Sequence, residues 1–375
     1  MKRSLIVICA LPVLSLMDFF LFQIFLIPYP IFIFLASLWI VIIIGGIKDL
    51  LIHILLFEFM ASIFLNAFIL KDFSIIIFQP LIFISLVIAG VYLGNNLEKY
   101  LKYLVWMMLI YSSLNFSIYI YRAIIYSGDF ARLRGNIAIY GGNSFQGYLF
   151  VFLLLLKIMD DNKNYYIFLT ISLLNSVFFL SRGGMIINAV WLVTDLFIYS
   201  GRSKNRNKFL VALIALGIGF YKFAPTDFIL YLATRFQYYF GYSNKLVGNR
   251  GPLLIEAFNW FQSNPINLFF GFGFNGFKDV SSAGYSNVHN FFLSILFENG
   301  IFSFLIVLII LSLILIRVEH KMFFLYSTLY ISFEGVNLFS INTNIYSGYL
   351  LFFIILIYSR LRRVLSLNLK SILEF

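Results

Sequence analysis

Long apolar runs separated by short polar turns most strongly constrain the fold of this chain. Apolar residues make up 62% of it and charged residues only 11%, whereas a soluble domain carries about 45–50% and about 25%. A helix needs roughly 20 apolar residues to cross a bilayer. The sequence therefore predicts an all-α fold, a polytopic membrane bundle of about 12 transmembrane helices.

The apolar runs also predict how the chain is divided. Residues 1–224 hold the first nine helices, with an outer loop at 126–142. Residues 225–289 form one large loop, and residues 290–375 hold the last three helices and a tail. The predicted spans are 4–27, 31–47, 50–70, 73–94, 103–125, 143–159, 165–180, 184–200, 209–224, 290–316, 322–340 and 346–359.

The distribution of lysine and arginine predicts the orientation. With the N-terminus inside, 17 of the 27 basic residues fall in inner turns and 10 on the outer side, four of them in the long loop. Short cytoplasmic loops are enriched in lysine and arginine, whereas long loops are largely exempt from this rule. Both termini are therefore predicted to be cytoplasmic, with the loop 225–289 on the outer face.

Composition and motifs exclude several function classes. The net charge of +11 is spread over short turns and forms no single basic stripe, which argues against nucleic-acid binding. A single cysteine permits neither an internal disulfide nor a cysteine zinc site. The outer carboxylates are scattered, so we expect no metal and no cofactor. The letters Gly271-Phe272-Gly273-Phe274-Asn275-Gly276 match GxGxxG, but no βαβ unit surrounds them and a dinucleotide site is not expected.

Four arginines lie on the outer side without an obvious structural reason. Arg132 and Arg134 occupy the loop 126–142, Arg122 lies near the outer end of the fifth span, and Arg182 follows the seventh. Such residues are candidates for binding an anion. The alternative is that each simply extends its charged end to the membrane interface.

The long loop contains a predicted amphipathic helix at 251–263, with Leu254 and Phe261 on its apolar face. Such a helix is suited to lie on the bilayer surface. Arg250 precedes it, where free helix N–H groups and a guanidinium together could hold an anion. The alternative reading is a solvated loop arginine.

His289 directly precedes Asn290 and the apolar run Phe291–Ile316. The start of a helix and nearby cations both disfavour the imidazolium form, so we expect a neutral imidazole at pH 7. A neutral imidazole can accept a proton from a hydroxyl group. The alternative is a hydrogen-bonded histidine at the membrane interface.

Three groups of residues together resemble the O-antigen polymerase and O-antigen ligase superfamily (Wzy and WaaL types). The first is Arg134-Gly135 followed by Gly142-Asn143-Ser144-Phe145-Gln146-Gly147. The second is Ser181-Arg182-Gly183-Gly184. The third comprises Arg250, Trp260, Pro265, Gly271-Phe272-Gly273, His289-Asn290 and Glu298-Asn299-Gly300. The resemblance covers roughly residues 125–305.

The resemblance implies a GT-C-like glycosyltransferase of the bacterial inner membrane. Its donor would be an undecaprenyl-diphosphate-linked oligosaccharide or polysaccharide, bound from the periplasmic side without metal or nucleotide sugar. Candidate partners besides the lipid bilayer are a chain-length regulator and a flippase. The implied catalytic residues are His289, Arg250 and Arg182, and the implied substrate-binding residues are Arg132, Arg134, Arg122, Asn290, Asn143, Trp260 and Glu298.

Three functions remain open from the sequence. The first is an O-antigen polymerase acting in lipopolysaccharide biosynthesis. The second is an O-antigen ligase that moves the glycan to the lipid A core, which shares the donor and differs in the acceptor. The third is a lipid-linked glycan transporter, which the sequence favours least because the two halves show no internal symmetry.

Overall fold

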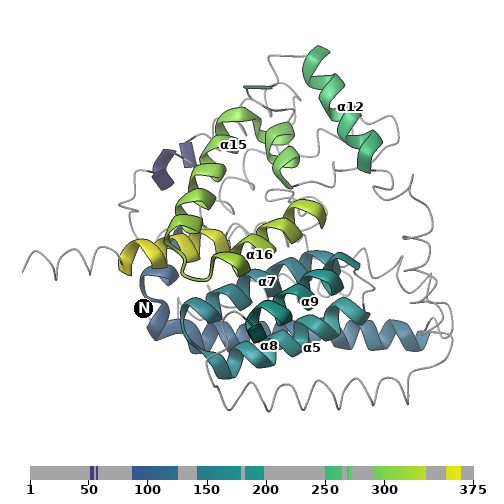
Figure 1. Ribbon diagram of the computed structural model, residues 1–375, viewed down its shortest axis with the longest axis vertical. Helices are drawn as coiled ribbons and strands as arrows, with labels where there is room; N and C mark the ends of the chain where they lie inside the picture. Colours follow the sequence, from purple (N-terminus) through teal and green to yellow (C-terminus); the bar gives the residue numbers. More distant parts are fainter. Residues whose placement is uncertain are drawn as a thin grey trace, which may run out of the picture.

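Helices and the turns between them make up the described part of the chain (Figure 1). The computed structural model describes residues 51–54, 56–57, 87–125, 142–178, 182–197, 250–263, 268–269, 271, 291–334 and 352–364. No strand occurs among these residues, which confirms the all-α class for them. Predicted spans such as 4–27, 31–47 and 209–224 lie outside the described residues, so the twelve-helix count stays a prediction.

The named helices are α5 (Leu97–Ile125), α7 (Gly142–Ile158), α8 (Asn162–Phe178), α9 (Arg182–Phe197), α12 (Arg250–Ser263), α15 (Phe291–Arg317) and α16 (Lys321–Glu334). Residues 87–95 and 352–364 are also helical. Except for α12, these helices fall on predicted spans. The polar turn at 159–161 separates α7 from α8, and a second at 318–320 separates α15 from α16.

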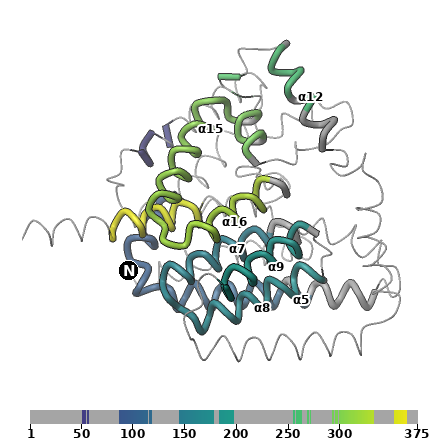
Figure 2. The backbone as a smooth tube through the Cα atoms, viewed as in Figure 1, coloured from purple at the N-terminus to yellow at the C-terminus, as the bar shows by residue number. Residues whose placement is uncertain are grey.

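Helix α7 occupies the centre of the described bundle (Figure 2). It contacts α8 and α16, while α9 contacts α8 and α16 in turn. Every residue from Phe145 to Leu156 is buried, as expected of a helix that is apolar on all sides. Phe150 anchors three helices together, because its ring stacks on Trp191 of α9 at 5.4 Å and meets the edge of Tyr330 of α16 at 4.9 Å.

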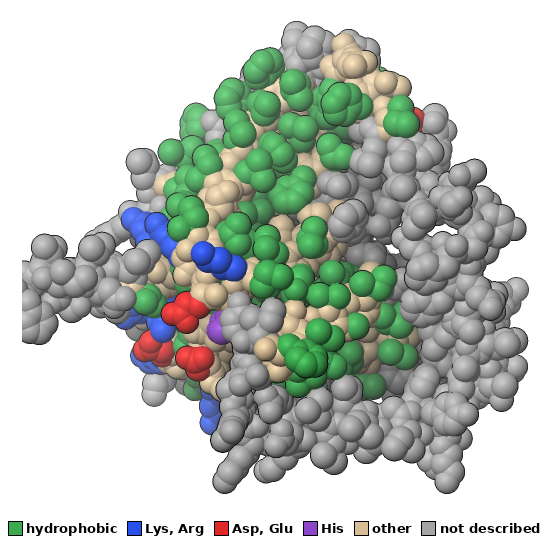
Figure 3. Space-filling model, viewed as in Figure 1, with side chains coloured by type: hydrophobic (Ala, Val, Ile, Leu, Met, Phe, Trp, Pro, Cys, Tyr) green, Lys and Arg blue, Asp and Glu red, His purple; other side chains and the backbone are tan. Residues whose placement is uncertain are grey.

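The peripheral helices expose apolar side chains at helical spacing. The stripes comprise Tyr103, Trp106 and Ile110 on α5, Ile186, Val190, Val193 and Phe197 on α9, and Phe302, Leu305, Ile309 and Ile316 on α15. Figure 3 shows apolar side chains covering much of this face. Contiguous apolar surface of this kind marks contact with a membrane or a protein partner.

Among the described helices, the segment Asn299–Arg317 is long and apolar enough to cross a membrane. Phe145–Ile158 and Gly183–Phe197 are apolar but shorter. Apart from Glu256 of α12, the described ionic side chains gather at one end of the bundle, where α5, α8 and α16 begin and α7 and α15 end (Figure 3). Every lysine and arginine whose side chain is described belongs to the set predicted to be cytoplasmic.

Two glycines bring residues 87–95 into close contact with residues 352–364. A Cβ atom on Gly90 would lie 2.9 Å from the carbonyl oxygen of Phe352, and one on Gly94 would collide with the carbonyl oxygen of Leu356. Small residues four apart allow helix backbones to approach in this way. Nearby, Arg360 donates a 2.7 Å hydrogen bond to Glu98 and thereby lowers the pKa of that exposed carboxyl group.

The predicted span 290–316 is not one straight helix. Gly300 interrupts α15 with φ 79° and ψ 179°, angles far from those of a helix (Figure 1). Glycine adopts positive φ without the steric cost that a side chain would add. The apolar run alone did not reveal this break, because a run of apolar residues reports burial and not backbone angles.

Candidate active site

The structure places the backbone of six predicted site residues. Arg122 lies in α5, Asn143 in α7, Trp260 in α12 and Glu298 in α15, while Arg182 and Arg250 are the first residues of α9 and α12. Arg132, Arg134, His289 and Asn290 lie outside the described residues. Of the ten, Trp260 has a described side chain, and it is half-buried.

Asn143 and Arg182 belong to helix starts at the same end of the bundle. Helices α7, α8 and α9 are joined by short turns and pack side by side, so the start of α7, the end of α8 and the start of α9 come together. Tyr111 of α5 packs on Phe145 of α7 at a ring separation of 4.8 Å. This end is opposite the one where most of the described ionic side chains lie (Figures 1 and 3).

A buried polar network ties these helix ends together. Gln146 of α7 donates to the hydroxyl of Ser172 of α8 at 2.6 Å, and Asn175 donates to the amide oxygen of Gln146 at 2.7 Å. Asn188 of α9 accepts from Ser172 at 2.8 Å and donates to the Ser172 carbonyl at 3.1 Å and to the Ser176 hydroxyl at 3.2 Å.

The network holds the first turns of α7 and α9 against the last turns of α8. It thereby sets the relative position of the backbones that carry Asn143 and Arg182. Gln146 belongs to the first motif group, whereas Asn175 and Asn188 belong to none of the motifs. Amide side chains inside apolar runs are costly unless they are bonded, and that signal could have identified them.

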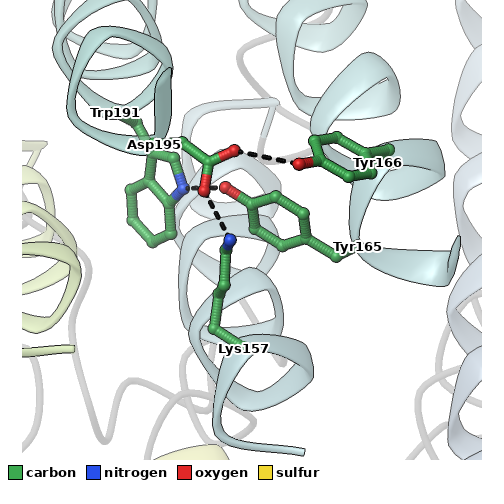
Figure 4. Close-up of polar contacts among 5 residues, drawn as sticks. All are labelled: Lys157, Tyr165, Tyr166, Trp191 and Asp195. Atoms are coloured by element: carbon green, nitrogen blue, oxygen red, sulfur yellow. Dashed lines mark hydrogen bonds and ion pairs between the residues drawn. The ribbon is translucent and has the colours of Figure 1, made fainter. Parts of the chain in front are cut away.

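A second polar cluster lies at the opposite end of the same helices (Figure 4). Lys157 of α7 forms an ion pair with Asp195 of α9, and the Tyr166 hydroxyl donates to the same carboxylate at 3.4 Å. Trp191 donates to the Tyr165 hydroxyl at 2.9 Å, and the ammonium of Lys157 sits 4.1 Å from the centre of the Tyr165 ring.

Asp195 is a carboxylate inside the predicted span 184–200, a signal that could have identified it as a buried ionic residue. It lies 13 residues after Arg182 on α9, which is roughly 20 Å along a helix. The cluster of Lys157, Tyr165, Tyr166, Trp191 and Asp195 is therefore not part of the candidate active site. It fastens α7, α8 and α9 at the other end.

Helix α12 contacts the first part of α15 through Phe261, which packs edge-on against Phe297 at 5.2 Å. The sequence placed Phe261 on the apolar face of this helix, and that side chain here contacts protein. Ile255 and Phe258 are each 64% exposed and make a separate apolar strip. The helix that begins with Arg250 is thus held against the helix that begins two residues after His289.

No group of three or more histidine, cysteine, aspartate or glutamate side chains that could hold a metal ion occurs in the described ranges. The expectation of a metal-free site involves residues beyond those ranges and stays a prediction.

Apolar outer faces and ionic groups gathered at one end are features that the described helices share with integral membrane proteins. Residues 167–308 match the family model of the O-antigen ligase. The match confirms, over this segment, the resemblance to the O-antigen polymerase and ligase superfamily. Comparisons with curated proteins and with solved structures give no match.

The family consists of membrane proteins that act on lipid-linked polysaccharides and resemble glycosyltransferases. The matched segment contains Arg182, Arg250, Trp260, His289, Asn290 and Glu298. Arg122, Arg132, Arg134 and Asn143 precede it.

Proposed function

We propose that this protein is an O-antigen polymerase that joins undecaprenyl-diphosphate-linked repeat units at the periplasmic face of the bacterial inner membrane. The observation that carries the proposal is the family match over residues 167–308, because that segment contains all three predicted catalytic residues, Arg182, Arg250 and His289.

In the proposed reaction, a sugar hydroxyl of one repeat unit attacks the anomeric carbon of the growing glycan. A new C–O bond forms as the bond to the diphosphate breaks, and the diphosphate leaves with the bonding electron pair. His289 takes the proton of the attacking hydroxyl. Displacement in one step inverts the anomeric centre. No metal is required, because arginines balance the charge of the diphosphate.

The place of each arginine at the start of a helix supports its proposed role in binding the diphosphate. Arg182 and Arg250 each begin a helix of at least 14 residues, and free N–H groups at a helix start favour an anion. Charge that develops on the leaving diphosphate is stabilised by such groups in the transition state. In this proposal Arg122, Arg132 and Arg134 add positive charge, while Asn143, Asn290, Trp260 and Glu298 contact the glycan.

The arrangement of charge supports the proposed orientation. The described lysines and arginines gather at the end opposite Arg182, and basic residues are enriched on the cytoplasmic side of membrane proteins. The end that carries Arg182 would then face the periplasm, and both termini would lie in the cytoplasm.

A ligase that transfers the glycan to the lipid A core is the second candidate, since the matching family model is described as the O-antigen ligase. Donor and leaving group are the same in both reactions. The lipopolysaccharide ladder of a deletion strain separates them. Loss of a polymerase leaves core with one repeat unit, whereas loss of a ligase leaves bare core with glycan on the lipid carrier.

The same ladder tests the proposed role of the arginines in binding the diphosphate. Arg182→Ala and Arg250→Ala should each abolish polymer, and the Lys variants should recover little, because a planar guanidinium bridges two phosphate oxygens and an ammonium does not. Arg362→Ala is the matched control, because Arg362 is exposed at the opposite end of the bundle. Normal ladders from Arg182→Ala would remove that residue from the diphosphate site.

A further inference from the structure

Asn299 is a buried polar side chain that the described protein leaves unbonded. It is 2% exposed, and neither its amide oxygen nor its amide nitrogen has a hydrogen-bond partner within the structure. Burying an amide without a partner is unfavourable, and more so in an apolar helix of a membrane protein. Such a group persists where something outside the fold bonds it or where function requires it.

Asn188 shows that this bundle can satisfy a buried asparagine. Asn188 is fully buried on α9, and its amide makes the three hydrogen bonds to Ser172 and Ser176 described above. Both asparagines are buried in the same fold. Protein groups form hydrogen bonds with the amide of Asn188, whereas the amide of Asn299 remains available to bond a ligand.

The backbone beside Asn299 is irregular as well. Gly300 carries φ 79°, is itself buried, and divides α15 into two parts that run in different directions (Figure 1). Irregular backbone within a membrane bundle is tolerated where it is buried in protein or lines a cavity. Membrane proteins place substrate sites at such breaks in their helices. The break is a second observation, independent of the unbonded amide.

The chemistry of the amide selects the class of ligand. Its nitrogen donates and its oxygen accepts, so the best partner both accepts and donates. A sugar hydroxyl does both, whereas a phosphate oxygen would leave the amide oxygen unpaired and a polyprenyl chain would leave both atoms unpaired.

Position agrees with this assignment. Asn299 is the ninth residue of α15, which begins two residues after the proposed catalytic residue His289. Nine helical residues span about 14 Å, a distance within the reach of an oligosaccharide. Helix α12 is fastened through Phe261 to Phe297, two residues before Asn299. We propose that Asn299 binds a sugar hydroxyl of the lipid-linked glycan. This inference rests on the proposed function.

The test compares two probes on purified protein in lipid nanodiscs. One is undecaprenyl diphosphate, and the other is the undecaprenyl-diphosphate-linked repeat unit extracted from a strain that lacks the protein. Asn299→Leu should bind the repeat-unit lipid about tenfold more weakly, the loss expected for a neutral hydrogen-bonding group. Its affinity for undecaprenyl diphosphate should stay unchanged, and its thermal midpoint should stay the same or rise, because an unbonded polar group has been removed.

Asn188→Leu is the matched control and should lower the thermal midpoint, since it deletes three internal hydrogen bonds. A similar fall in Asn299→Leu, with unchanged affinity for the repeat-unit lipid, would overturn the inference and give Asn299 a structural role. An equal loss of affinity for both probes would also overturn the inference, because the amide would then not contact the sugar specifically. If the unaltered protein binds neither probe, the proposed function itself fails.

Discussion

His289 carries the most specific chemical task proposed for a single residue. General base catalysis is typically worth about 10²–10⁴-fold, so His289→Ala should lose activity of that order in a polymerisation assay with purified protein. Affinity for undecaprenyl diphosphate should change little, because the arginines hold the diphosphate.

His289→Gln separates two roles of this histidine. Glutamine can orient a hydroxyl group but cannot take its proton. A loss as deep as that in alanine would support proton transfer. Near-normal turnover would show instead that the side chain only positions the acceptor.

His320 gives a pH prediction at the end of the bundle where most of the described ionic side chains lie. It lies in the turn between α15 and α16, where burial, followed by the charge of Lys157, lowers its pKa from the usual 6.5. Asp160, Asp195 and Glu319 act in the opposite direction but do not reverse the shift. The unfolded chain therefore binds a proton more readily than the folded one, so stability falls as pH drops below about 6.5.

The thermal midpoint at pH 7.5 and at pH 5.5 tests this prediction. His320→Gln should show a smaller fall between the two values than the unaltered protein, since glutamine does not titrate. An equal fall in both proteins would show that other groups control the acid response.

At the scale of helices, the Lys157–Asp195 pair fastens α7 to α9. Both side chains are almost fully buried, and removing one partner of a buried pair leaves an uncompensated charge. Asp195→Leu should therefore destabilise the protein by about 3–5 kcal/mol. The double variant Lys157→Met with Asp195→Leu should recover most of that loss. Thermal unfolding of both variants measures the loss of stability. A double variant no more stable than the single variant would contradict the pairing.

The two-glycine contact predicts a packing effect at a second helix interface. In Gly94→Ala the added methyl would lie 2.8 Å from the Cβ atom of Ser359 and against the Leu356 carbonyl. Overpacking of this kind costs about 1–3 kcal/mol, measured as a lower thermal midpoint. Ser113→Ala, on an exposed position of α5, should leave the midpoint nearly unchanged. A Gly94→Ala protein as stable as that control would show that the helices separate without cost.

At the scale of the whole molecule, the excess of lysine and arginine in the predicted inner turns predicts the topology. A reporter fused after Ser243 should behave as exported, and one fused after Phe375 as cytoplasmic, because the loop 225–289 is predicted to be periplasmic. Alkaline phosphatase and a cytoplasmic fluorescent protein provide the two readouts. The reverse pattern would place His289 in the compartment that lacks the substrate.

The sequence alone predicted the all-α class of the described residues and the resemblance to a family. Apolar runs and polar turns are local properties, and the helices α5, α7, α8, α9 and α16 lie where those runs predicted them. The predicted amphipathic helix at 251–263 likewise corresponds to α12. The motifs identified a superfamily that the family match over residues 167–308 confirms.

Only the tertiary structure decided which buried polar groups meet. Lys157 pairs with Asp195 across 38 positions of sequence, and Gln146 with Ser172 across 26. Asn188 is saturated with hydrogen bonds while Asn299 has none within the described protein. Composition cannot distinguish those two asparagines, because hydrogen bonding depends on which helix faces touch, and that is set by the packing of segments far apart in the chain.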